Sequence, residues 1–283
     1  MKFTAAKGKS NPRVIPGFGL TLGTTLAFLS LLILIPLASV LVYSFSLTPA
    51  EFWEILLSES VVWSFVTTIG CALIAALINC VFGTILAWTL VRYDFPFKRL
   101  LDGLIELPFA LPTAVAGITL SKLFSDQGFF GAPLARIGIR VSYTHLGIIT
   151  AMVFIGIPFV VRTVQPVLSK LDPQFEEAAY CLGASPARSF FRVVLPELRP
   201  ALLTGFGLAL ARGIGEYGSV IYIAGNSAKE HTQVSSYIIM QKLNYLDYEG
   251  ATAVALVMLI LSFGLLLFTN IIQIRQARRT GMR

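Results

Sequence analysis

Long stretches without a charged residue constrain the fold of this chain more than any other feature of its sequence. The uninterrupted ones are residues 14–50, 60–91, 107–121, 141–161 and 250–274. A transmembrane helix needs about 20 predominantly apolar residues, so all of them except 107–121 are long enough to span a bilayer alone. The shorter stretch needs its flanking charged side chains to reach back to the membrane surface. Only 13% of the residues are charged and 55% are hydrophobic, which leaves too little polar surface for a soluble globule.

A further apolar segment, 200–225, is interrupted by Arg212 and Glu216. Each half of this segment is too short to cross the bilayer by itself, so we interpret the whole as one span. The sequence therefore predicts an all-α polytopic protein with six transmembrane helices surrounded by membrane lipid.

Lysine and arginine are distributed unequally between the two sides of this predicted topology. Six spans place both termini on one side, and the opposite side holds only Lys122, Arg136, Arg140, Lys229 and Lys242. Because cytoplasmic loops are enriched in Lys and Arg, both termini are predicted to be cytoplasmic. The same rule explains the formal net charge of +7 without any nucleic-acid partner.

Only one segment predicted to be cytoplasmic, residues 162–199, is long enough to hold structure of its own. Pro173 begins a first short helix and Gly183 is placed as its C-terminal cap. Pro186 begins a second short helix, and Pro196 is predicted to stop it just before the fifth span. A compact helical hairpin on the cytoplasmic face is the expected result.

This hairpin carries a spaced motif that resembles a known family. It reads Glu177-Ala178-Ala179, three residues, Gly183, nine residues, Val193, one residue, Leu195-Pro196. The spacing resembles the EAA loop of ABC-importer permeases, which usually has isoleucine at the position of Val193. Small alanines allow close approach to a partner, the glycine permits a turn, and the glutamate offers a charge for docking. The plainer interpretation is an amphipathic connector with good helix caps.

The resemblance implies a type I ABC-importer permease fold in which the loop at about 172–196 is a cytoplasmic coupling helix. Such a helix seats in a groove of a separate ATPase subunit, here through Glu177, Ala178, Ala179 and Gly183. The expected organisation is a cytoplasmic tail 1–19, a first transmembrane helix 20–45, a transmembrane core 62–274 and a C-terminal tail 275–283.

Three further strings, residues 107–117, 159–166 and 211–219, resemble the T-type permease subunit of sulfate/thiosulfate importers. Molybdate permeases are similar in the last string but usually carry Phe at the position of Tyr217. The resemblance implies ABC ATPase subunits, a second, homologous permease subunit and an extracytoplasmic sulfate- or thiosulfate-binding protein, in a bacterial inner membrane. It implies import of sulfate or thiosulfate by alternating access, with a permease for molybdate or another oxyanion as the alternative.

Two places in the membrane are candidates for the ion pathway. Arg212 and Glu216 lie four residues apart and border two sets of small residues with the same spacing, a pattern typical of close helix packing. Arg212 could add positive potential to an anion pathway, or it could pair with Glu216 and lock helix packing. Pro108 and Pro112 predict a bend or break that could line a cavity or merely fit neighbouring helices.

The sequence predicts no catalytic site, metal site or cofactor in this chain. His145 and His231 are isolated, and the Gly-Lys-Ser string at residues 8–10 lacks the upstream glycine of a phosphate-binding loop. Two other classes of protein fit the sequence less well. An ATP-independent secondary anion transporter gives no reason for the hairpin, and a membrane enzyme or assembly scaffold would need clustered reactive residues.

Overall fold

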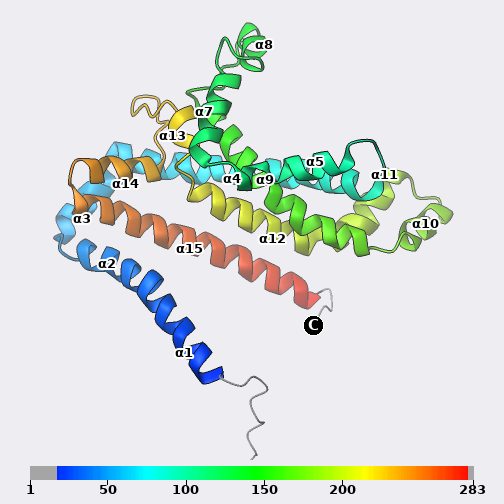
Figure 1. Ribbon diagram of the computed structural model, residues 1–283, viewed down its shortest axis with the longest axis horizontal. Coiled ribbons are helices and arrows are strands. Elements are labelled where there is room, and N and C mark those ends of the chain that lie inside the picture. Colours follow the sequence, from blue (N-terminus) through cyan, green and yellow to red (C-terminus); the bar gives the residue numbers. More distant parts are fainter. Residues whose placement is uncertain (1–17, 280–283) are drawn as a thin grey trace, which may run out of the picture.

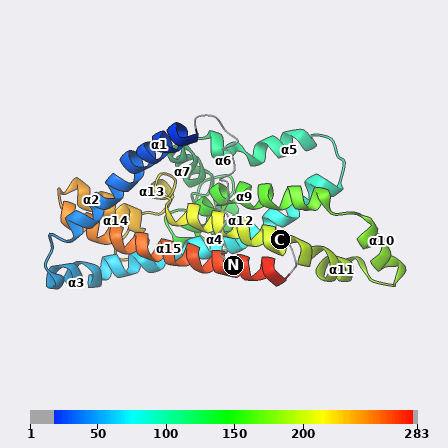
Figure 2. The same ribbon diagram turned by 90° about the horizontal axis from the view of Figure 1, so that it is seen from below.

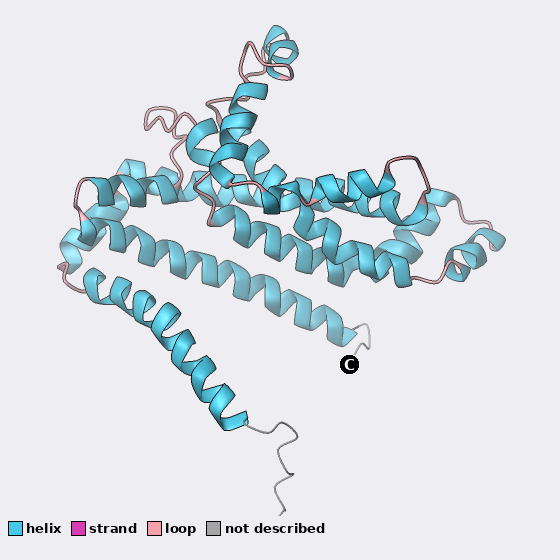
Figure 3. Ribbon diagram, in the orientation of Figure 1, coloured by secondary structure: helices cyan, strands magenta, loops and turns pink. Residues whose placement is uncertain are grey.

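The computed structural model describes residues 18–279, and within that range it consists of helices and loops (Figure 3). Its longest helices lie side by side along one axis: α4 (Glu59–Arg92), α9 (His145–Lys170), α12 (Leu195–Ile214) and α15 (Tyr248–Arg279) (Figures 1 and 2). The helices α4, α9 and α12 contact one another, and α15 packs on α12. The hydrophobic core lies between these helices.

Five helical segments in the described range are long and apolar enough to cross a membrane. They are Phe18–Ser44, Glu59–Arg92, His145–Lys170, Pro186–Ile214 and Tyr248–Arg275. They correspond to the first, second, fourth, fifth and sixth predicted spans, so the all-α polytopic prediction is confirmed. The last helix continues to Arg279, through residues expected to begin the C-terminal tail.

The first apolar helix diverges from the bundle (Figure 1). It consists of α1 (Phe18–Leu29), a π-helical turn η1 (Ser30–Leu34) and α2 (Ile35–Ser44), and only its α2 end packs against α15. The expected N-terminal tail lies outside the described residues except for 18–19, which are already helical. A short helix, α3 (Pro49–Leu57), follows and begins with a capping box between Thr48 and Glu51.

The third predicted span is divided into short pieces. The chain forms α5 (Lys98–Ile105), α6 (Leu107–Ala110), α7 (Thr113–Leu123) and α8 (Gly131–Arg136), with extended backbone at Leu111 and Pro112. Proline lacks an N–H and disfavours helical geometry in the residue before it, so the break lies where the sequence placed it. With 11 residues, α7 is too short to cross a bilayer, and it projects with α8 from the side of the bundle (Figure 1).

The predicted limits of the fifth span are wrong at both ends. Pro196 does not stop the hairpin, because α11 (Pro186–Ser189), a π-helical turn η2 (Phe190–Val194) and α12 form one continuous helical segment. In that turn the N–H of Leu195 donates to the carbonyl of Phe190, five residues back, and the wider turn accommodates the proline.

At its other end this span stops at Ile214, not at residue 225. The chain turns over residues 215–219 before the short helix α13 (Val220–Ile223). The turn forms because a carboxylate oxygen of Glu216 accepts the backbone N–H of Ser219 at 2.7 Å, which takes the backbone out of the helical path.

The small residues of α12 lie where their spacing predicted, against neighbouring helices. A Cβ atom at Gly205 would lie 2.9 Å from the Cα of Val160 on α9, and one at Gly213 would lie 3.2 Å from the Cβ of Ala72 on α4. Both glycines are buried. The close approach of backbones places α12 at the centre of the bundle.

The last connection in the chain is fixed by one carboxylate. After α14 (Ser235–Asn244), Asp247 accepts hydrogen bonds from Lys242 Nζ and from the N–H of Gly250, each at 2.8 Å. Partial burial of Asp247 acts to raise its pKa, but these hydrogen bonds and the charge of Lys242 outweigh it and hold the pKa below its usual value. The ionised carboxylate thus caps the start of α15.

Candidate functional site

The hairpin that the sequence predicts to be cytoplasmic is built by local signals at the end of the bundle. The Oδ1 atom of Asp172 accepts the backbone N–H of Gln174 at 3.0 Å, which begins helix α10 (Gln174–Cys181). Gly183 ends it with a φ of 81°, and its N–H donates to the carbonyl of Tyr180 at 2.9 Å. A left-handed residue in this position is the usual end of a helix, so the predicted glycine cap is confirmed. Figure 1 places α10 and α11 together at the end of the bundle opposite α3 and α14.

The predicted ATPase-coupling residues lie on the outside of this hairpin. Glu177, Ala178 and Gly183 are exposed and Ala179 is partly buried. Two large apolar side chains, Phe175 and Leu182, are 61% and 89% exposed beside them. We call the five exposed residues of this set, Phe175, Glu177, Ala178, Leu182 and Gly183, the coupling surface. It combines an exposed carboxylate with exposed apolar side chains.

A second glutamate on α10 has an inward partner that sequence reasoning missed. Glu176 forms an ion pair with Arg92, the last residue of α4, and the two side chains are 13% and 20% exposed. The guanidinium carbon of Arg92 lies 5.5 Å from the ring centroid of Trp88, and Trp88 meets Phe190 edge-on at 5.4 Å. From the sequence Glu176 is only an acidic residue at a helix N-terminus; its partner lies 84 residues away and leaves no local signal.

The predicted pair of Arg212 and Glu216 forms. Glu216 is 2% exposed and forms an ion pair with Arg212. Its carboxylate also accepts hydrogen bonds from the backbone N–H of Ser219 at 2.7 Å and from the Ser219 hydroxyl at 2.9 Å. Every polar interaction of the carboxylate is therefore with the turn or with Arg212. This geometry agrees with the packing role more closely than with a free charge on a pathway.

The structure brings the two membrane candidates together. A Cβ atom at Gly117 in α7 would lie 2.7 Å from the Cα of Ser219, in the turn that Glu216 stabilises. Gly218 is equally close to Thr113, which begins α7 directly after the break at Pro112. Pro108 is buried in the first turn of α6. The broken segment and the end of α12 thus form one junction, which the sequence presented as two separate features.

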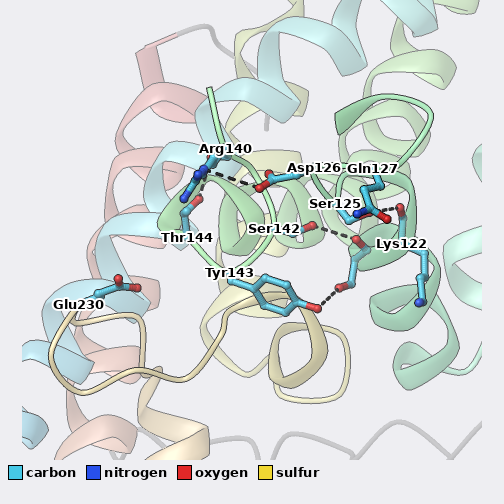
Figure 4. Close-up of a pocket in the computed structure, with 10 residues that line it drawn as sticks. Lys122, Ser125, Asp126, Gln127, Arg140, Ser142, Tyr143, Thr144 and Glu230 are labelled. Atoms are coloured by element: carbon cyan, nitrogen blue, oxygen red, sulfur yellow. Dashed lines mark hydrogen bonds and ion pairs between the residues drawn. The ribbon is translucent and has the colours of Figure 1, made fainter. Parts of the chain in front are cut away.

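A polar pocket of about 500 Å³ lies at the N-terminal end of α9, and sequence reasoning missed it. Figure 4 shows its lining, which includes Lys122, Asp126, Arg140 and Glu230. Arg140 and Asp126 are 3.7 Å apart and both exposed. The coupling surface follows the other end of α9, about 40 Å away at 1.5 Å per residue over 26 residues. The pocket and the coupling surface therefore lie on opposite sides of a span.

The two histidines, which the sequence presents as isolated, lie close together. His145 Nε2 is 3.1 Å from the backbone carbonyl of His231, and the His231 ring stacks on Trp63 at 4.3 Å. Among the described residues no group of three or more His, Cys, Asp or Glu side chains could hold a metal ion.

Comparison with known proteins identifies the family of this chain. Residues 79–281 match the family described as binding-protein-dependent transport system inner membrane component. The chain is 50% identical to the sulfate transport system permease protein CysT of Escherichia coli K12 over 95% of its own length and 97% of that protein. It is 43% identical to the protein of the same name in Synechococcus elongatus, over 91% and 92% of the two chains.

Solved structures share the fold at low sequence identity. A bacterial alginate ABC transporter in complex with an alginate pentasaccharide-bound periplasmic protein matches with a TM-score of 0.74 and 19% identity, over 94% of both chains. The MetNI methionine ABC transporter in an inward-facing conformation matches with a TM-score of 0.57 over 81% of this chain and 99% of that one. The family model covers the later part of α4, the helices α9, α12 and α15, the hairpin and the membrane junction. This chain therefore belongs to the family of binding-protein-dependent transport system inner membrane components, the multi-pass inner membrane part of ABC importers, which is not itself the ATPase.

Proposed function

We propose that this chain is a permease subunit of an ATP-driven importer that moves sulfate or thiosulfate into the cell by alternating access. The observation that carries the proposal is the exposed coupling surface on α10, in a chain half identical to a sulfate transport permease over nearly its whole length. Nucleotide-driven movement of ATPase subunits would displace α10, and the bundle would alternate between inward-open and outward-open states.

The charge of the substrate requires an energy source outside this chain. A doubly negative oxyanion entering a cell that is negative inside by roughly 100 mV climbs about 4.6 kcal/mol, at about 2.3 kcal/mol per charge. A passive pore would let the anion leave. A permease with a docking face for ATPase subunits meets this requirement through ATP hydrolysis, and that face is what a secondary transporter driven by an ion gradient leaves without a purpose.

We further propose six spans with both termini cytoplasmic, the third span being the broken segment around residues 107–121. Backbone breaks at membrane depth are tolerated where they are buried in protein or line a cavity. The break at Pro112 lies against the turn after α12, so this junction is our candidate lining of the translocation pathway. In it Arg212 and Glu216 hold the turn, and the backbone around Pro108 and Pro112 faces the route of the ion.

The proposed partners follow from the two ends of the bundle. ABC ATPase subunits would bind the coupling surface at one end. An extracytoplasmic sulfate- or thiosulfate-binding protein would bind near the polar pocket at the other end, where charges of both signs are exposed. A second, homologous permease subunit would complete the membrane domain and cover apolar area of the spans that this chain leaves exposed.

Uptake of radiolabelled sulfate by cells with and without the protein tests the proposal. Uptake that is competed by thiosulfate more strongly than by molybdate supports it, and the reverse order favours the molybdate alternative. Glu177→Arg should abolish both ATPase capture and uptake. The matched control Glu54→Arg, on an exposed residue of α3 at the other end of the bundle, should retain both. ATP-independent uptake by the purified chain alone would refute the proposal.

A further inference from the structure

We propose that the Glu176–Arg92 ion pair is a positioning link that transmits movement of α10 directly to α4. The inference rests on the proposed function, because it concerns the same coupling helix. The coupling surface is proposed to face the ATPase, whereas Glu176 on the same helix faces the bundle. The geometry assigns the two neighbouring glutamates of α10 to opposite tasks.

The backbone connections of α10 do not fix its position on the bundle. Before it, Leu171 has extended backbone with a ψ of 119°, and after it Gly183 has left-handed backbone with a φ of 81°. In our proposal these non-helical residues on both sides are the hinges about which α10 moves relative to α9 and α11. Helix α10 also contacts α11 and the turn η2, and a push on α10 reaches α4 in a defined direction only if a further attachment joins those two helices.

The ion pair supplies that attachment and connects it to two spans. Arg92 is the last residue of α4, a helix of 34 residues that contacts both α9 and α12. Its guanidinium lies over Trp88, and Trp88 contacts Phe190 in the π-helical turn that leads into α12. Movement of Glu176 is thus passed to α4 through a charge-assisted hydrogen bond and to the start of α12 through aromatic contacts.

The ion pair between Glu176 and Arg92 involves fewer interactions than the ion pairs of Arg162 on α9, so it can break or shift when α10 moves. Arg92 has one acidic partner in the described part of the chain. Arg162 on α9 is different, because it binds Asp102 at 2.8 Å and Glu106 at 2.7 Å and so clamps the α5–α6 segment. A cavity of about 530 Å³ beside the Arg92 pair, lined in part by Trp88 and Phe190, leaves room for α10 to shift.

The test separates ATP hydrolysis from transport in the assembled transporter. Complexes with ATPase subunits and binding protein are placed in proteoliposomes, and sulfate uptake is divided by ATP hydrolysed. Glu176→Gln and Arg92→Gln should assemble and hydrolyse ATP, while uptake per ATP falls by at least about fivefold, the low end of usual coupling free energies. Arg92→Lys, which keeps the charge, and the exchange Glu176→Arg with Arg92→Glu should restore the ratio.

Two comparisons keep the inference distinct from the proposed function. The matched control is Asp94→Asn, which removes a nearby ion pair between Asp94 and Lys98. The Asp94 side chain is 99% exposed, so this change should leave the uptake per ATP unchanged. An unchanged ratio in the Gln variants, or loss of ATPase assembly in them, would overturn the link. If Glu177→Arg left ATP-dependent uptake intact, the assignment of the coupling surface would be refuted, and the proposed link through Glu176 would be refuted with it.

Discussion

Replacing Asn79 by leucine should stabilise the protein. Asn79 lies near the middle of α4 and is 1% exposed, yet neither its Nδ2 nor its Oδ1 atom has a hydrogen-bond partner in the described part of the chain. Its amide fits against α9 because residue 156 there is glycine, since a Cβ at that position would overlap the Nδ2 atom of Asn79. With neither polar atom paired among the described residues, the amide is buried without compensation.

The size of the effect follows from the burial of this amide. An unpaired polar group of this kind costs about 1–3 kcal/mol when it is removed from water or from a partner. Leucine branches at Cγ as asparagine does, so Asn79→Leu removes the penalty with little change of shape. At roughly 2–4 °C per kcal/mol for chains of a few hundred residues, the unfolding midpoint should rise by several degrees.

Thermal unfolding of the purified transporter in one detergent, followed by intrinsic fluorescence, measures the shift. Asn79→Asp should lower the midpoint, because it buries a carboxylate in the same place. Asn270→Leu is the matched control: Asn270 is exposed on α15, and the same change there should have little effect. A midpoint lowered by Asn79→Leu would refute the reasoning, since it would mean that the amide makes interactions worth more than its burial costs.

Three further changes test single contacts. Gly117→Leu should abolish the yield of monodisperse protein, because the new Cβ meets the backbone of Ser219, whereas Gly103→Leu, with open space around it, should not. Gly183→Val should lower the unfolding midpoint, at a cost of about 1–2 kcal/mol for left-handed backbone, and Gly183→Asn should cost less; equal midpoints would contradict the cap. The pKa of Asp247 is lowered in the folded protein, so the stabilisation it provides is fully present above a pH of about 4 and is lost as the pH falls through the folded pKa. The difference in unfolding midpoint between the wild type and Asp247→Asn should therefore shrink only in that acid range.

Sequence reasoning located the spans well because hydrophobic length is a local property. The charge-free stretches 60–91 and 250–274 became α4 and α15 with ends displaced by at most a few residues. The break at Pro112 and the cap at Gly183 were equally predictable, since each depends on the backbone of one residue.

The errors have a shared physical cause. Pro196 did not stop a helix because a π-helical turn absorbed it, and residues 215–225 did not continue one because a buried side chain bent the backbone. Both outcomes depend on the three-dimensional surroundings of the residue. Apolar composition, which continues unchanged through Val220–Ile223, gave no sign of the turn.

The charged residues show the same division between local and distant interactions, and the division bears on mechanism. Arg212 and Glu216 are four residues apart, so their pairing was predictable. Asp102, one partner of Arg162, is 60 residues from it, and the partner of Arg92 is 84 residues away, so these pairs were not predictable. Arg162 has two acids and clamps the broken segment to α9, which makes that part of the bundle rigid. Arg92 has one acid and holds a hairpin with hinges on both sides. The α5–α6 segment, held by two ion pairs, resists displacement more than the singly held α10, so a push on the hairpin should move α10 and, through Arg92, α4 before it separates α5 and α6 from α9.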